Sequence, residues 1–160
     1  MDNINELKQG GVIMIATNIE QSEHLLELGL DPKTADMFWK YSASLGNTDI
    51  NGRIAVSYHD NLFVGKYDGA IPAWSLSALL EVMPKELVNV GYNKKGEQVV
   101  SLAKLIIDTF IVDERSMWRI GYKGKRRYWV KCYSDNPIRA AWDMICFLIR
   151  QGYIKKGGES

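Results

Sequence analysis

Residues 136–152 constrain the fold of this chain more than any other segment. Asn136 has the side chain of a helix cap, Pro137 suits the first helical turn, and Gly152 offers a left-handed stop. Between them, apolar side chains recur every three or four residues, at Ile138, Ala141, Trp142, Ile145, Leu148 and Ile149. A helix with one apolar face needs an apolar surface to cover, so the sequence predicts that this helix packs on a sheet.

Strand-like runs precede this helix and supply such a surface. The pattern predicts strands at about residues 99–112, 117–122 and 127–133, with a tight turn at Lys123 and Gly124. Two further strands, at 53–58 and 62–67, are expected to pair across a turn at 59–61. The helices are too few to connect parallel strands. We therefore expect an α+β fold with an antiparallel sheet of about five strands, packed by the C-terminal helix and by N-terminal helices.

The N-terminal part of the chain predicts two helices. Thr17 and Glu20 have the spacing of a capping box, at the start of a helix that ends at Gly29. Asp31 followed by Pro32 predicts a second helix over about residues 32–44. We expect both helices to share one core with the rest of the chain, through Leu25, Leu26, Phe38 and Trp39.

A third helix is expected after Pro72. Ser75 is a suitable cap, Pro84 ends the helix, and its apolar face consists of Leu76, Leu79, Leu80 and Met83. Residues 91–96, which are rich in Gly, Asn and Lys, are expected to form a loop or hairpin.

Composition favours one compact domain over residues 1–160, with flexible tails at 1–11 and 153–160. The chain is 46% hydrophobic and 24% charged, which is typical of a packed domain. Its longest apolar runs, 12–16 and 105–107, are far shorter than the roughly 20 residues of a membrane span. Acidic Asp2 and Glu6 stand where a secretory signal would be basic, so we expect a cytoplasmic protein with no membrane partner.

The two cysteines, Cys132 and Cys146, fit the same expectation. We predict that both are buried small hydrophobic residues in a reducing compartment. A disulfide or a reactive thiol is the alternative interpretation.

The charge of the chain is distributed unevenly. Residues 1–114 carry 9 basic and 16 acidic side chains and residues 115–160 carry 11 and 3, so the two parts have net charges of −7 and +8. Residues 115–131, here called the basic ribbon, hold seven of the 20 basic residues and no acid. Aromatic side chains lie between these cations. The candidate nucleic-acid or anion-binding residues are Arg119, Lys123, Lys125, Arg126, Arg127, Trp129 and Lys131.

Strict alternation along the last strand predicts one mixed face. Arg127, Trp129, Lys131 and Tyr133 would share a side, and cations beside flat rings are suited to hold phosphates and stack bases. An acidic protein is a second partner that suits such a face. The third interpretation is purely structural: aromatic residues favour strands, and cations protect exposed sheet edges.

The sequence predicts no catalytic residue, metal site or cofactor. The two histidines, His24 and His59, lie far apart and have no further ligand at metal-binding spacing. Ser75 lacks the flanking glycines of a hydrolase nucleophile, and its capping role explains it. Asp108, inside an apolar strand, is predicted to take an outward edge position or to form an ion pair with a neighbouring Lys or Arg, and not to act as a general base. A small enzyme whose site is assembled only by the fold remains an alternative.

Two segments resemble small uncharacterised proteins encoded in bacterial prophages and mobile elements. They are residues 17–37 (TNIEQSEHLLELGLDPKTADM) and residues 71–80 (IPAWSLSALL). The resemblance implies a phage-related or mobile-element accessory protein and transfers no site residue. Together with the absence of a catalytic motif, it predicts a non-enzymatic protein that acts by binding a macromolecule.

The order of elements over residues 75–151, read as helix, three strands and helix, resembles double-stranded RNA-binding domains. Such domains place lysines at the start of the last helix to grip phosphates. Here that position has Asp135 and a single late cation, Arg139. The contact that such a domain most needs is therefore missing.

Overall fold

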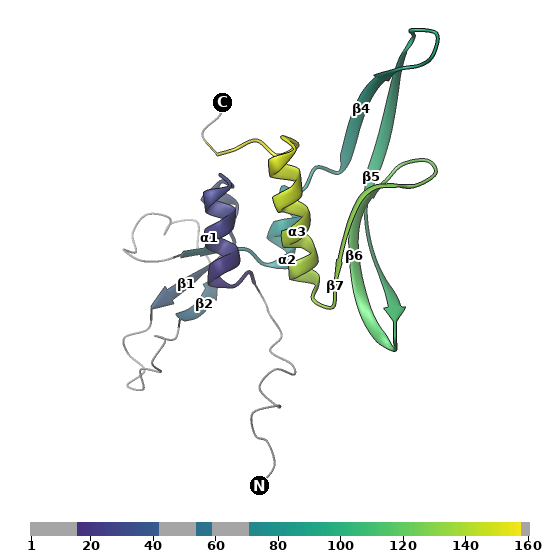
Figure 1. Ribbon diagram of the computed structural model, residues 1–160. Helices are drawn as coiled ribbons and strands as arrows, with labels where there is room; N and C mark the ends of the chain where they lie inside the picture. The colour runs from purple at the N-terminus through teal and green to yellow at the C-terminus, as the bar shows by residue number, and fades with distance from the viewer. Residues whose placement is uncertain (1–15, 42–53, 59–70, 158–160) are drawn as a thin grey trace.

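The computed structural model describes residues 16–41, 54–58 and 71–157 (Figure 1). Three α-helices, one short 3-10 helix and seven strands follow one another along these residues. They are α1 (Ile19–Glu27), η2 (Pro32–Thr34), β1 (Met37–Tyr41), β2 (Ile54–Tyr58), β3 (Ile71–Ala73), α2 (Leu76–Val82), β4 (Glu86–Tyr92), β5 (Gln98–Val112), β6 (Arg115–Lys123), β7 (Tyr128–Ser134) and α3 (Pro137–Arg150).

The strands form two antiparallel sheets. The main sheet has the order β4-β5-β6-β7, and a smaller sheet has the order β2-β1-β3. The predicted α+β class is confirmed, but the expected single sheet of about five strands is in fact these two sheets. The sequence prediction missed β4, because its apolar run is short: Gly91 follows Val90, and the polar residues of the turn begin after Tyr92. The segment from α2 to α3 therefore holds four strands, which differs from the order of a double-stranded RNA-binding domain.

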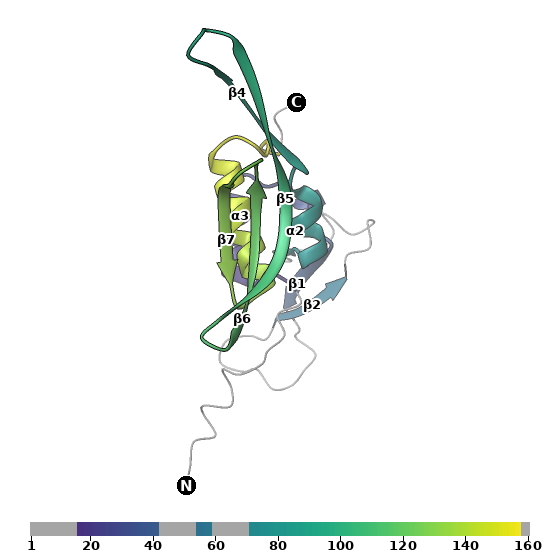
Figure 2. The ribbon, with the colours of Figure 1, turned by 90° about the vertical axis from the view of Figure 1, so that its right-hand side faces the viewer.

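Helix α3 covers one face of the main sheet (Figures 1 and 2). As predicted, Asn136 caps it, accepting hydrogen bonds from the backbone of Ile138 and Arg139, and Pro137 starts it. Ile120 and Tyr122 of β6 are fully buried in the same apolar cluster as Ile145. The Tyr122 hydroxyl donates to the Pro84 carbonyl at 2.6 Å, so the one polar atom of this ring is satisfied inside the core.

Trp142 does not pack on the sheet, although the sequence predicted that the whole apolar face of this helix would. It is half-buried, and its Nε1 donates to the Gln21 carbonyl of α1 at 3.1 Å. Its ring lies 5.6 Å from the His24 ring, centroid to centroid. Trp142 therefore joins α3 to α1, on the side of the helix away from the strands.

The N-terminal cap of α1 lies one residue later than predicted. Asn18 and Gln21 form the capping box, with reciprocal hydrogen bonds of 2.8 and 3.0 Å. Thr17 is instead fully buried, where its hydroxyl lies 2.8 Å from that of Ser22 and accepts from the Trp74 backbone. A capping box was correctly predicted, but its first residue is Asn18. The Thr17 hydroxyl instead bonds to polar groups between the helix and β3. Gly29 ends the helix with a φ of 93°, as expected.

The helix predicted over about residues 32–44 is wrong over residues 32–41, and residues 42–44 lie outside the described part of the chain. The chain forms one 3-10 turn after the Asp31 cap and then enters β1. Met37 pairs with Ala73 and Tyr58, so the apolar run favours strand pairing once β2 and β3 are available. Trp39 donates from its Nε1 to the Thr17 carbonyl at 2.8 Å.

The apolar core is divided into two clusters. Leu25 and Leu26 join the main one, whereas Trp39 packs with Ala16, Met37 and Ala73 in a small second cluster. Among the described residues, Leu25 and Trp39 therefore belong to different clusters, whereas the sequence predicted one shared core. The strand expected at 62–67 and the tail at 1–11 lie outside the described residues.

The C-terminal segment up to Gly157 lies against the body, where a tail had been expected from residue 153. Ile154 packs on the main cluster, and the Gly157 amide donates to the Gly29 carbonyl at 2.8 Å. The side chain of Lys156 lies over Gly29. The end of the described chain therefore covers the end of α1.

Replacement of Ile145 by alanine should lower the free energy of unfolding by about 2–5 kcal/mol, because it removes a fully buried side chain between α3 and the sheet. Urea denaturation monitored by circular dichroism measures this change. Arg139→Ala, at an exposed position of the same helix, is the control and should stay within about 0.5 kcal/mol of the parent. Equal stabilities of the Ile145 variant and the parent would contradict the position of α3.

Candidate nucleic-acid interface

The face of the main sheet opposite α3, here called the outer face, is open. Within the described residues, no helix lies over it (Figures 1 and 2). The register of β5, β6 and β7 determines which side chains it presents. They are Lys104, Ile106, Asp108, Phe110 and Val112 from β5, Arg115, Met117, Arg119 and Lys123 from β6, and Tyr128, Lys131 and Tyr133 from β7.

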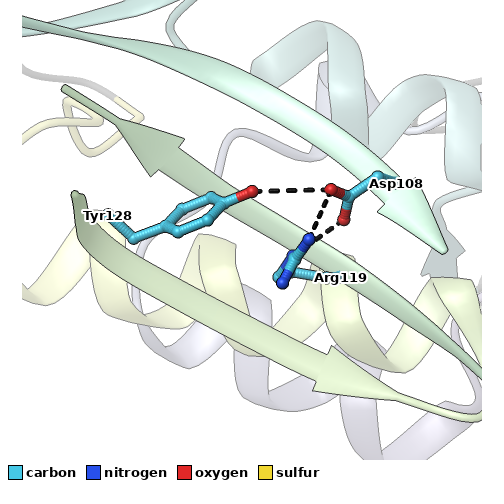
Figure 3. Close-up of polar contacts among 3 residues, drawn as sticks. All are labelled: Asp108, Arg119 and Tyr128. Atoms are coloured by element: carbon cyan, nitrogen blue, oxygen red, sulfur yellow. Dashed lines mark hydrogen bonds and ion pairs between the residues drawn. The ribbon is translucent and has the colours of Figure 1, made fainter. Parts of the chain in front are cut away.

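An ion pair lies at the centre of the outer face (Figure 3). Asp108 and Arg119 are direct partners across β5 and β6. The guanidinium donates from Nε at 2.8 Å and from a terminal nitrogen at 2.6 Å to the two carboxylate oxygens. This bidentate geometry fixes both side chains, and the predicted ion pair of Asp108 is confirmed.

Two aromatic rings contact the guanidinium of Arg119. Its Cζ lies 5.1 Å from the centroid of the Phe110 ring and 5.0 Å from that of Tyr128. The Tyr128 hydroxyl also donates to Asp108, at 3.5 Å (Figure 3). Arg119 is thus a neutralised and fixed cation.

The same contacts shift both pKa values toward the charged forms. The hydrogen bond from Arg119 is the main cause that lowers the pKa of Asp108, and the hydrogen bond to Asp108 raises the pKa of Arg119. Asp108 therefore stays ionised at neutral pH and is a poor proton acceptor. This geometry does not support general base catalysis by Asp108.

The other cations of the basic ribbon are exposed. Within the described residues, no acidic group lies within ion-pair distance of Arg115, Lys123 or Lys131. Lys123 has its ammonium 5.7 Å from the Tyr128 ring centroid. These side chains can therefore meet an anionic partner without first breaking an ion pair.

The turn between β6 and β7 contains the remaining predicted cations. Lys125, Arg126 and Arg127 are all exposed, and the Gly124 amide closes the turn by donating to the Arg127 carbonyl at 2.9 Å. The turn borders a groove of about 480 Å³ beside β5. Its lining consists of Val100, Ser101, Leu102, Lys125, Arg126, Arg127 and Trp129.

Strict alternation fails in β7 because the strand contains an irregularity. Tyr122 pairs with Val130, but the next residue, Lys123, pairs with Tyr128, so Trp129 is skipped. Trp129 packs against the main core, and a Cβ on Gly124 would lie 2.6 Å from its Nε1. The predicted face of Arg127, Trp129, Lys131 and Tyr133 is therefore wrong. Tyr128 takes the outer position, whereas Lys131 and Tyr133 lie there as expected.

A hollow of about 770 Å³ lies at the β5–β6 end of the outer face. Tyr133 is its most accessible ring, 57% exposed, and it meets Phe110 edge to face at a centroid distance of 6.1 Å. Arg115 and Lys131 contribute charge, opposed by Asp113. The lining residues are Phe110, Val112, Asp113, Arg115, Met117, Arg119, Lys131 and Tyr133.

Sequence reasoning predicted an ion pair for Asp108 but did not place β5 on this face. Asp108 and Phe110 are two residues apart, which places them on one side of a strand, but only the register shows that this side faces Arg119. The cross-strand contact between opposite charges was the available signal.

The described residues do not support a nucleophile or metal site. Both cysteines are free, and burial raises the pKa of each thiol to about 11, so they are protonated at neutral pH. Cys146 is buried as predicted, and Cys132 is half-buried. No cluster of three His, Cys, Asp or Glu residues with metal-binding geometry occurs in residues 16–41, 54–58 and 71–157, and His59 lies outside them. In the same residues, no helix has the length and apolarity of a membrane span.

Comparison with known proteins gives no match. Neither a family model, nor a curated protein, nor a solved structure matches the chain.

The Asp108–Arg119 pair should make stability depend on pH. The pKa of Asp108 is lowered on folding, so the pair contributes fully above the unfolded value of about 3.9 and is lost as pH falls through the lower folded value. Between about pH 5 and pH 2, the parent should therefore lose more stability than Asp108→Asn. Urea denaturation at each pH measures this difference.

Glu81→Gln, at an exposed carboxylate of α2, is the control and should follow the parent curve. A parent and an Asp108→Asn variant with the same pH dependence would contradict the role of the pair.

Proposed function

We propose that this protein binds single-stranded nucleic acid across the outer face of its main sheet. The observation that carries the proposal is the combination of unpaired cations with an exposed aromatic ring on one open face. Arg115 and Lys131 would hold phosphates, and Tyr133 would stack on a base. The protein acts by binding and not by catalysis.

The proposed role of Arg119 is indirect, because its charge is already neutralised at the centre of the face. Its guanidinium is already paired with Asp108 and contacted by two rings, so a phosphate would have to compete with a bidentate carboxylate. The adjacent position, Gly121, has no room for a side chain, since a Cβ there would lie 3.0 Å from the Tyr128 ring and 2.7 Å from the Val130 carbonyl oxygen. Arg119 thus positions Tyr128 while the cations around it meet the ligand.

The architecture favours single strands over duplexes. An open sheet face with accessible rings suits splayed bases, which a base-paired duplex does not present. The start of α3, where a duplex-binding domain would have lysines, presents Asp135 and Arg139. The turn of Lys125, Arg126 and Arg127 extends the cationic surface beyond the face for a backbone that continues past it.

The whole-chain charge sets a limit to the affinity. Residues 1–114 have a net charge of −7 and repel the same polyanion. We therefore expect micromolar or weaker binding at physiological salt. The resemblance of two segments to prophage proteins supports an accessory role in a phage or mobile element, and the two free thiols support a cytoplasmic site of action.

The proposal is tested by fluorescence anisotropy with a labelled single-stranded oligonucleotide over a range of salt concentrations. Lys131→Gln should flatten the logarithmic salt slope by about one unit, because it removes one phosphate contact. Tyr133→Ala should weaken binding by about 1–3 kcal/mol if the ring stacks on a base, with little change in slope.

Two controls match these changes in type. Lys33→Gln and Tyr153→Ala alter an exposed cation and an exposed tyrosine away from the main sheet, and both should bind as the parent does.

Asp108→Asn should strengthen binding, because it leaves Arg119 without its carboxylate partner. No binding of the folded parent at low salt would exclude nucleic acid and favour an acidic protein as the partner of this face.

A further inference from the structure

The hairpin of β4 and β5 projects beyond the rest of the molecule (Figures 1 and 2). Past Leu87, which is buried, both strands leave the core. Val88 and Val90 are 52% and 51% exposed, and Tyr92 is 75% exposed. On the adjacent strand, Val100 and Leu102 are 58% and 49% exposed. An apolar surface of this kind on a projecting hairpin is typical of a docking site.

Strand β4 is also an open edge of the main sheet in the described part of the chain. Leu105 donates to the Lys85 carbonyl and Asn93 donates to the Glu97 carbonyl, so odd-numbered residues between them direct their backbone groups toward β5. The even-numbered residues Glu86, Val88, Val90 and Tyr92 therefore direct their N–H and C=O groups outward. The strand has no proline or lysine to prevent pairing with another chain.

We infer that β4 pairs antiparallel with β4 of a second copy of this chain, forming a dimer with one continuous sheet. The charges on the hairpin select this occupant. Glu86 lies 3.8 Å from the Lys104 ammonium of its own hairpin, and this pair is exposed to solvent. If Val90 lies on the two-fold axis, Glu86 also lies opposite Lys94 of the partner subunit, and the symmetry repeats this pair at the other end. Between these charge pairs, Val88 lies opposite Tyr92 of the partner subunit, so apolar side chains meet across the new strand contact.

This arrangement gives partners both to the open backbone edge of β4 and to its exposed apolar side chains. The outward backbone groups of Val88, Val90 and Tyr92 gain partners, and their exposed side chains gain apolar neighbours. The negative residue at one end of β4 and the positive residues of the turn at the other make the edge self-complementary in the antiparallel direction only. The inference does not depend on what the outer face binds.

Analytical ultracentrifugation of the full chain over a range of concentrations tests the dimer. The parent should be a dimer at high concentration. Val90→Lys should raise the dissociation constant about tenfold or more, because it places two like charges opposite each other on the axis. Val99→Lys is the matched control, an exposed valine on β5 whose backbone faces β4, and it should dimerise as the parent does.

Charge reversal tests the register. Glu86→Lys and Lys94→Glu should each weaken the dimer, and the double variant should restore it. Restoration by the double variant supports the pairing of these two residues. A parent that is monomeric at all concentrations, or a dimer unchanged by Val90→Lys, would overturn the inference.

A disulfide probe gives an independent test. Directly opposed residues in a hydrogen-bonded antiparallel pair have Cα atoms about 5.5 Å apart, which a disulfide spans. Val90→Cys should therefore form a covalent dimer on mild oxidation, whereas Val99→Cys and the parent, with its own two cysteines, should not. Equal cross-linking of Val90→Cys and Val99→Cys would contradict the two-fold position of Val90.

Discussion

The packing of α3 on β6 and β7 is the interaction on which the rest of the structure depends. Ile120 and Tyr122 of β6 and Met144 and Ile145 of α3 are all fully buried in this layer. Because one helix covers one face of the sheet, the alternate side chains of the same strands must face away from it. The apolar repeat of α3 thus leads directly to an open sheet face that contains Arg119, Lys131 and Tyr133.

The outer face is ordered by its own interactions, since no helix in the described part of the chain supports it. The Asp108–Arg119 pair and the rings of Phe110 and Tyr128 form one connected cluster across three strands. Within this cluster, Arg119 of the basic ribbon has a structural role. Arg115, Lys123 and Lys131 lie at its margin. The distinction between a fixed cation and accessible cations is the basis of the proposed phosphate binding.

The parts of the fold that are determined locally were predictable from sequence. The Asn136 cap with Pro137, the Ser75 cap and the Gly29 stop all follow from neighbouring residues. The errors arise where distant partners decide the outcome. Residues 37–41 became a strand because β2 and β3 pair with them, and Thr17 was drawn from a capping role into the core. Trp129 is displaced from the outer face because one residue is skipped in the β6–β7 register. No periodicity in the sequence reveals this irregularity.

Photo-cross-linking of the full chain to a single-stranded oligonucleotide, followed by trypsin and mass spectrometry, tests the central claim most directly. Cleavage after Arg127, Lys131 and Arg139 places Tyr128 and Tyr133 of the outer face in separate peptides, and the peptide of residues 140–150 reports on α3. The account predicts cross-links in the peptides of residues 128–131 and 132–139 and none in that of α3. Cross-links confined to the α3 peptide would contradict binding by the outer face.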